Sequence, residues 1–318
     1  MGINFHCRIL TGLFSIFILN IVGLAEEKNS TDKVAATVNG DPIYESELSV
    51  SSKNNVLAII DPEARNVKLE RVIHSRIIRQ FLKTNKIEVT EAEINAEVED
   101  LRKNPPSAGC SCCRYPSLEA FMDANYYDMK ELRGEISNNL GIDKYLDALW
   151  GIKYSSPEEQ EKLIKKERPR LEKEYVRASQ IFFNTYQNPD FRNNPDKVRK
   201  DIQAKALAAW RRLQKEDTFE NVARQESDDT MSKSKGGLLG CIPIGVFGKS
   251  FSNAISELKA GEYSKPVETT LGFHIIRREV ITKNDALNIL KDDFKNQSWP
   301  DIETKAVQDA EVKQNKPQ

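Results

Sequence analysis

The sequence predicts an α+β protein with a mostly helical N-terminal domain, a second domain of mixed strands and helices, and a C-terminal helix. Its 318 residues suffice for two domains of ordinary size. Between about residue 44 and residue 150, apolar residues recur at spacings of three and four, which is typical of amphipathic helices. From residue 175 onward, strand-like segments alternate with helical ones, which indicates a compact α/β or α+β unit of about one hundred residues.

The composition excludes several classes of protein. Lys and Arg total 47 against 48 Asp and Glu, a formal charge of −1, so the chain has no global basic field that would hold nucleic acid. Apolar residues make up 39% of the chain and the mean hydropathy is −0.56, which excludes a polytopic membrane protein. The three histidines, His6, His74 and His274, are too few for a multi-histidine metal centre.

Residues 1–25 have the parts of a secretory signal peptide. A positive charge at Arg8 precedes an apolar run, and the small residues Gly23 and Ala25 predict cleavage after Ala25. An uncleaved anchor is the alternative, although the run is shorter than the ~20 apolar residues of a membrane span. We therefore expect an exported protein, in the periplasm or at the outer face of the cytoplasmic membrane, with no membrane insertion after signal cleavage.

The helical N-terminal domain is predicted to cover residues 26–154. Residues 34–38 are expected to form a short strand, and Asn39-Gly40 supplies the positive φ angles of a tight hairpin turn. Three amphipathic helices follow, which are predicted from the apolar residues Leu69, Val72, Ile73, Ile77 and Phe81, then Ile94, Val98 and Leu101, and then Met129, Leu132, Ile136 and Leu140.

Two capping boxes predict where helices begin. Thr90 with Glu93 indicates one helix start in the N-terminal domain, and Ser156 with Glu159 indicates another. The second opens a segment that is dense in charge and poor in apolar residues. We therefore expect residues 155–174 to form a solvated connector helix between the domains.

The second domain is predicted to cover residues 175–281. Residues 175–183 and 273–280 are strand-like. Between them the helical patterns are Val198, Ile202, Ala206, Ala209 and Leu213, then Phe219, Val222 and Ala223, and then residues 251–258. Residues 282–318 are expected to form a helix that packs on the N-terminal domain, because its apolar stripe must be buried, and then a polar tail.

Four segments of the second domain agree with one known family. They are VRASQIFF at 176–183, FENVARQESDD at 219–229, GGLLG at 236–240, and LKAGEYSKPV at 258–267 leading into GFHIIR at 272–277. In this order and spacing they resemble the parvulin-type peptidyl-prolyl cis-trans isomerase domain, which implies a small antiparallel sheet with surrounding helices. The flanking segments are similar to those of exported foldases and chaperones of the SurA and PrsA kind.

The resemblance implies a protein-folding enzyme without a cofactor. Rotation about an X-Pro bond faces a barrier of about 18–20 kcal/mol that amide resonance sets, but no bond is broken, so neither a nucleophile nor a metal is required. A catalyst needs an apolar shelf for the proline ring and polar groups that favour the twisted amide. The implied partners are unfolded or nascent exported proteins with X-Pro bonds, not nucleic acid.

The resemblance also implies which side chains bind the substrate. It places the proline shelf on Leu239, Phe247 and Phe251, although composition alone favours core positions for these three. Thr269 is expected beside the substrate. Gly236-Gly237 lacks the ending of a phosphate loop and is expected to form a tight turn leading to the shelf.

Three polar residues are implied to act on the amide. Asp229 lies where the family has Cys or Asp facing the substrate carbonyl, with a helix-terminal or turn aspartate as the alternative. His274 corresponds to the histidine of the last strand, where it orients the polar network. Gln180 replaces a histidine of the family; its amide both donates and accepts, but it cannot titrate. Leu271 replaces a frequent Ser or Thr, so we expect weak to moderate isomerase activity.

The cysteines are independent of this resemblance. Cys110, Cys112 and Cys113 leave three alternatives open: a disulfide from Cys110 to Cys112 or Cys113, a Cu(I) or Zn(II) site, and free or redox-active thiols. Cys241 is expected to be a small buried residue, or a fourth thiolate if a metal binds. We predict no cofactor, and no metal ligands other than this cluster.

Two other functions are consistent with the sequence. The first is a non-catalytic periplasmic chaperone, in which the parvulin domain binds peptides or is structural only. The second is a metal or redox protein centred on the cysteine cluster. An isomerase assay distinguishes the enzyme from the chaperone, and metal analysis tests the metal or redox protein.

Overall fold

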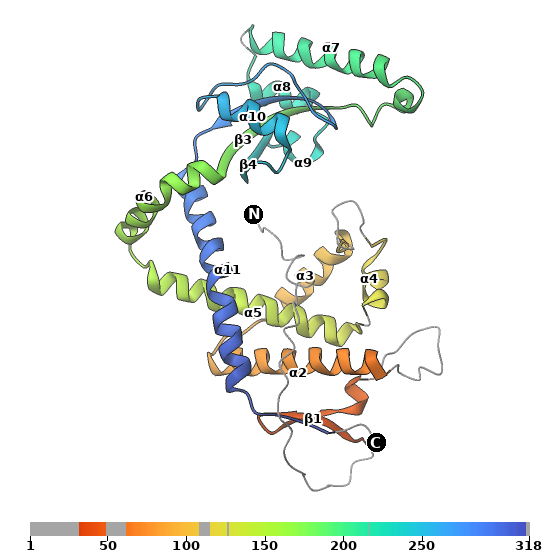
Figure 1. Ribbon diagram of the computed structural model, residues 1–318, viewed down its shortest axis with the longest axis vertical. Helices are drawn as coiled ribbons and strands as arrows, with labels where there is room; N and C mark the ends of the chain where they lie inside the picture. The colour runs from red at the N-terminus through yellow and green to blue at the C-terminus, as the bar shows by residue number, and fades with distance from the viewer. Residues whose placement is uncertain (1–31, 49–61, 108–114, 126, 216, 316–318) are drawn as a thin grey trace. The chain divides into compact units, whose positions relative to one another are not determined.

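The computed structural model describes residues 32–48, 62–107, 115–125, 127–215 and 217–315 (Figure 1). The chain divides into two units, Met1–Lys153 with Phe294–Gln318, and Tyr154–Asp293. The predicted α+β class is confirmed. The predicted signal peptide lies outside the described residues. Among the helices that the structure does describe, none combines the length and the apolarity needed to cross a membrane.

Unit 1 contains a three-stranded antiparallel sheet in the order β2-β1-β7. Its strands are β1 (Val34–Val38), β2 (Asp41–Tyr44) and β7 (Val312–Gln314), and the short helix η1 (Glu45–Leu48) follows β2. The predicted turn between β1 and β2 is confirmed, since Asn39 has φ 50° and Gly40 has φ 81°. The predicted polar tail contains the strand β7, which pairs with β1 and places Val312 opposite Val38.

The helices of unit 1 pack around this sheet and around one another. They are α2 (Pro62–Thr84), α3 (Glu91–Lys103), α4 (Leu118–Ala124), α5 (Met129–Lys153) and the second part of α11 (Lys283–Asp309). α2 buries Leu69, Ile73 and Ile77 against the sheet, and Ile78 and Leu82 against α5. Residues of α11 contribute to both clusters, through Ala306 and Val307 in the first and Trp299 and Ile302 in the second.

Both predicted capping boxes are present. Thr90 accepts a hydrogen bond from the backbone N–H of Glu93 at the start of α3, and Ser156 does the same with Glu159 at the start of α6 (Pro157–Glu174). The Glu93 and Glu159 side chains accept in return from the backbone N–H of the N-cap residue. Backbone N–H groups that have no partner within the helix are thus hydrogen-bonded at each helix start.

Unit 2 is built on a four-stranded antiparallel sheet in the order β4-β3-β6-β5. The strands are β3 (Tyr175–Asn184), β4 (Leu238–Pro243), β5 (Val267–Glu268) and β6 (Gly272–Glu279). The helices are η2 (Pro189–Arg192), α7 (Pro195–Leu213), α8 (Phe219–Glu226), α9 (Thr230–Lys233) and α10 (Lys249–Glu257), and α6 and the first part of α11 belong to the same unit.

The two faces of this sheet are covered by different helices. Ile181 and Phe183 of β3 pack with α7 and α8, whereas Val176 and Ala178 of β3 pack with Phe251 and Ile255 of α10. Side chains alternate between faces along a strand. Even-numbered residues of β3 therefore share the face that α10 covers.

Candidate functional site

The register of the sheet brings Gln180 and His274 together. Gln180 lies on the central strand β3 and His274 on the neighbouring strand β6, where Phe182 pairs with His274 and Gln180 with Ile276. Both side chains are on the α10 face, and both are buried, with 4% and 3% of their surface exposed. Buried polar groups must find partners inside the protein. The predicted pair is thus held in place by sheet geometry.

A continuous hydrogen-bond chain joins four of the predicted site residues. The Gln180 Nε2 donates to Asp229 Oδ2 at 2.8 Å, and Gln180 Oε1 lies 2.9 Å from His274 Nδ1. At the other edge of the ring, His274 Nε2 lies 2.9 Å from Thr269 Oγ1. The structure therefore brings Asp229, Gln180, His274 and Thr269 into one network.

The chemistry of the partners fixes the direction of this chain. An ionised Asp229 can only accept, so the Gln180 amide must present its nitrogen to the carboxylate and its oxygen to His274. His274 Nδ1 then carries the proton and donates to Gln180. The unprotonated Nε2 is left to accept from the Thr269 hydroxyl, which itself accepts from the backbone N–H of Leu271 at 3.2 Å.

Asp229 is also the N-cap of α9. Its carboxylate accepts from the backbone N–H of Met231 at 3.1 Å and from the hydroxyl of Ser232. Burial raises the pKa of this carboxyl, but the hydrogen bonds from Ser232 and Gln180 outweigh it and hold the pKa below its ordinary value. The alternative of a helix-terminal aspartate is thus correct, and the same side chain faces the network.

His274 is neutral at physiological pH. Burial lowers its pKa to about 4, because the cationic ring loses water, and the Asp229 charge offsets only part of this effect. Phe182 stacks on the ring at 4.5 Å between centroids, and Phe251 meets it edge-on at 5.7 Å. The histidine is therefore oriented from both sides and does not act as a cation.

The three residues of the predicted shelf lie together on the same face. Leu239 and Phe247 are half-buried and pack against the cluster that contains Phe251. The rings of Phe247 and Phe251 are 4.9 Å apart. Phe251 itself is only 2% exposed, so it supports the shelf from below. The apolar surface that a proline ring can reach is formed by Leu239 and Phe247.

The glycine turn after α9 fixes the position of Gln180. Gly237 has φ 84°, and its carbonyl accepts from the backbone N–H of Gln180 at 2.8 Å. A Cβ atom at this position would lie 2.3 Å from the Gln180 carbonyl oxygen. Only glycine permits both the left-handed backbone and this close approach. The turn thus joins the network to the start of β4, which carries Leu239.

Sequence reasoning missed two residues of the site. Ser232 donates to Asp229, and Phe182 stacks on His274. Both had a local indication in the sequence. Phe182 lies two residues after Gln180 on a strand, hence on the same face, and Ser232 lies three residues after an N-cap aspartate.

Of the four cysteines that follow the predicted signal peptide, the structure describes only Cys241. Cys110, Cys112 and Cys113 lie outside the described residues. Cys241 on β4 is a free, half-buried cysteine, and burial raises the pKa of its thiol to about 11. Among the residues with described positions, no group of three His, Cys, Asp or Glu side chains is placed to hold a metal ion.

Comparison with known proteins gives a family match for this part of the chain. Residues 181–280 match the family model described as "Rotamase: PPIC-type PPIASE domain", which confirms the parvulin resemblance and the predicted enzyme class. "Foldase protein PrsA" of Caldanaerobacter subterraneus subsp. tengcongensis is 47% identical over 73 residues, which cover 23% of this chain and 24% of that protein. "Foldase protein PrsA 2" of Bacillus cereus is 24% identical over 274 residues, which cover 86% of this chain and 76% of that protein.

Two solved structures are similar over most of the chain. PrsA from Bacillus subtilis has 23% identity and a TM-score of 0.41, and the alignment covers 87% of this chain and 90% of that one. PrsA from Streptococcus pneumoniae has 16% identity and a TM-score of 0.46, with 82% and 92% covered.

Proposed function

Residues 181–280 belong to the PPIC-type peptidyl-prolyl isomerase family, and from this premise we propose that the protein is an exported foldase that accelerates X-Pro isomerisation in unfolded polypeptides. The observation that carries the proposal is the oriented chain from Thr269 to Asp229 beside an apolar shelf. This arrangement provides the fixed polar groups and the apolar contact surface that rotation about an X-Pro bond requires. None of its groups has to exchange a proton during the rotation.

The proposed mechanism favours the twisted amide. In the planar X-Pro amide, resonance places partial negative charge on the carbonyl oxygen and partial positive charge on the nitrogen. An apolar shelf of Leu239 and Phe247 removes the water that solvates this charge separation. The Asp229 carboxylate further disfavours negative charge on the carbonyl oxygen. Both effects raise the free energy of the planar amide more than that of the twisted transition state, which lowers the barrier.

The shelf offers the sharpest test of catalysis. In a protease-coupled assay on a short X-Pro peptide, Phe247→Ala is expected to lower kcat/KM by roughly tenfold or more. Phe251→Ala is unsuitable, because truncating a buried phenylalanine costs about 3–5 kcal/mol of folding stability. Val280→Ala is the matched control, since Val280 is exposed and lies outside the cluster of Phe247. Equal activity of the Phe247 variant and the control would contradict the shelf.

The same assay separates the proposed enzyme from a non-catalytic chaperone. The unaltered protein is expected to accelerate isomerisation above the uncatalysed rate. If it does not, but still suppresses the aggregation of an unfolded client, the protein acts as a chaperone only.

Export and the client class are part of the same proposal. The signal-like residues 1–25 and the relatives named foldases support a protein that acts on exported chains outside the cytoplasm. Cell fractionation with an antibody against the protein tests this. Recovery with the cytoplasm would contradict it.

A further inference from the structure

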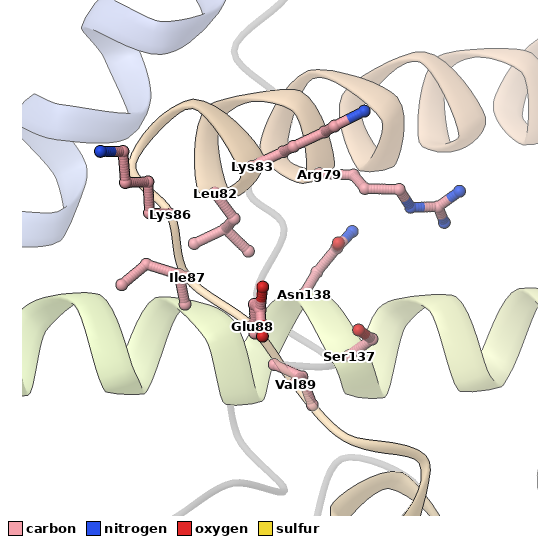
Figure 2. A pocket seen from close by; sticks show the side chains of 9 residues that line it. All are labelled: Arg79, Leu82, Lys83, Lys86, Ile87, Glu88, Val89, Ser137 and Asn138. Atoms are coloured by element: carbon pink, nitrogen blue, oxygen red, sulfur yellow. The ribbon is translucent and has the colours of Figure 1, made fainter.

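Unit 1 contains a pocket that the isomerase site does not use. It lies between the C-terminal part of α2 and the middle of α5, and the segment from Lys86 to Val89 borders it (Figure 2). Its volume is about 280 Å³, close to the lower limit of sites for small ligands or single side chains. Leu82, Ile87 and Val89 give it an apolar part.

Three cations border this pocket without an acidic partner. Within the described residues, Arg79, Lys83 and Lys86 make no ion pair and no side-chain hydrogen bond. Basic residues nearby are paired: Arg76 lies 2.7 Å from Asp41, and Lys144 lies 2.8 Å from Glu93.

The lining carries a net positive charge. Among its nine residues, Glu88 is the one acid, which leaves a net charge of +2 from three cations and one anion. Lys83 lies in the last turn of α2 and Lys86 lies two residues beyond its end, where cations also complement the helix dipole. Arg79 lies more than a turn earlier, so the dipole does not explain its position.

Arg79 is accommodated by a glycine on the opposite helix. A Cβ atom at Gly134 of α5 would lie 2.9 Å from Arg79 Nη2, so the guanidinium occupies the space that a methyl group would fill. Glycine is less favourable than alanine in the interior of a helix. The glycine at position 134 nevertheless leaves room for the unpaired Arg79 guanidinium beside the pocket. The polar residues Ser137 and Asn138 of the same helix also line the pocket.

We propose that this pocket binds an acidic side chain, flanked by apolar residues, of an unfolded polypeptide. The Arg79 guanidinium complements a carboxylate, and Leu82, Ile87 and Val89 complement its apolar neighbours. The Lys83 and Lys86 side chains point away from one another (Figure 2) and contribute through the net positive charge of the lining. The proposal rests on the proposed foldase function for its ligand class. It gives unit 1 a contact with the client that is separate from the proline shelf.

The test is the binding of two labelled peptides to the full-length protein, measured by fluorescence anisotropy. One peptide has Glu between leucines, and the other has Gln in its place. We expect the Glu peptide to bind about fivefold more tightly, and Arg79→Gln to remove this difference. Lys83→Gln and Lys86→Gln should each weaken Glu-peptide binding by roughly two- to fivefold.

A pair of glycine variants controls for folding. Gly134→Ala favours the helix but displaces the Arg79 guanidinium, so it should weaken Glu-peptide binding without loss of stability. Gly151→Ala, in the same helix, meets nothing within 4 Å and should leave binding unchanged. Equal binding of the Glu and Gln peptides, or equal behaviour of the two glycine variants, would overturn the inference. The X-Pro isomerase rate, measured on the same samples, reports separately on the proposed function.

Discussion

The amide oxygen of Gln180 lies 2.9 Å from His274 Nδ1, on the neighbouring strand of the same sheet. Because the amide nitrogen is committed to Asp229, this contact selects the tautomer of His274 with the proton on Nδ1, while burial keeps the ring neutral. A histidine at position 180 could present either nitrogen and could take up a proton, whereas glutamine does neither. The network of this protein therefore contains one titratable ring instead of two.

Asp229→Asn should disable the network while keeping the fold. Asparagine caps α9 as well as aspartate does, but the negative charge is lost. We expect kcat/KM on an X-Pro peptide to fall by about tenfold or more, with little change in melting temperature. Asp190→Asn is the control, because Asp190 is an exposed carboxylate on η2. Full activity of the Asp229 variant would show that the charge is not needed.

Gln180→His should introduce a dependence on pH. The new ring would lie between the Asp229 carboxylate and His274, and a neighbouring carboxylate favours the protonated form. Peptide isomerisation by the unaltered protein should vary little between about pH 5 and 8, because the pKa of His274 is about 4. The variant should lose activity as the pH falls through this range. Identical pH profiles for the two proteins would contradict this role of Gln180.

Burial of neutral His274 should make the protein less stable in acid. The pKa of this ring is about 4 when folded and about 6.5 when unfolded, so below pH 6.5 the unfolded chain binds a proton that the folded protein does not. The contribution is absent above pH 6.5, and destabilisation grows as the pH falls towards 4. There it reaches about 3 kcal/mol and then levels off. Urea unfolding of the unaltered protein and of the His274→Gln variant, carried out over this pH range, measures this destabilisation. The free energy of unfolding of the variant should fall less steeply as the pH is lowered.

Local patterns predicted much of the fold, because helical spacing and capping depend on neighbours in sequence, whereas the site residues came from the family resemblance. The stripe of Leu69, Ile73 and Ile77 and the capping boxes follow from helical spacing. Other features depend on partners far along the chain. The strand β7 exists because Val312 pairs with Val38, and a three-residue segment has too little pattern to reveal this.

The depth at which a side chain is buried and the partners of charged side chains also could not be predicted from the sequence. The family resemblance placed Phe251 on the shelf, but its depth beneath Phe247 depends on how α10 packs on the sheet. The approach of Arg79 to Gly134 likewise follows from the packing of α2 against α5, and a glycine inside a helical pattern does not reveal its neighbour. Periodicity predicts which face of an element is buried, whereas the atoms that meet there depend on tertiary packing.

Substitutions at two glycines near the site distinguish the effect of backbone strain from the effect of a steric contact. Gly237 and Gly240 have nearly equal φ angles, 84° and 86°, so alanine at either position costs about 1–2 kcal/mol of conformational energy. Only at Gly237 would the added Cβ meet the Gln180 carbonyl oxygen, at 2.3 Å, whereas at Gly240 it meets nothing within 4 Å. Gly237→Ala should therefore be the more destabilising and should displace Gln180, lowering kcat/KM, while Gly240→Ala keeps the network. Equal losses of stability and activity in the two variants would mean that the contact with β3 does not position Gln180.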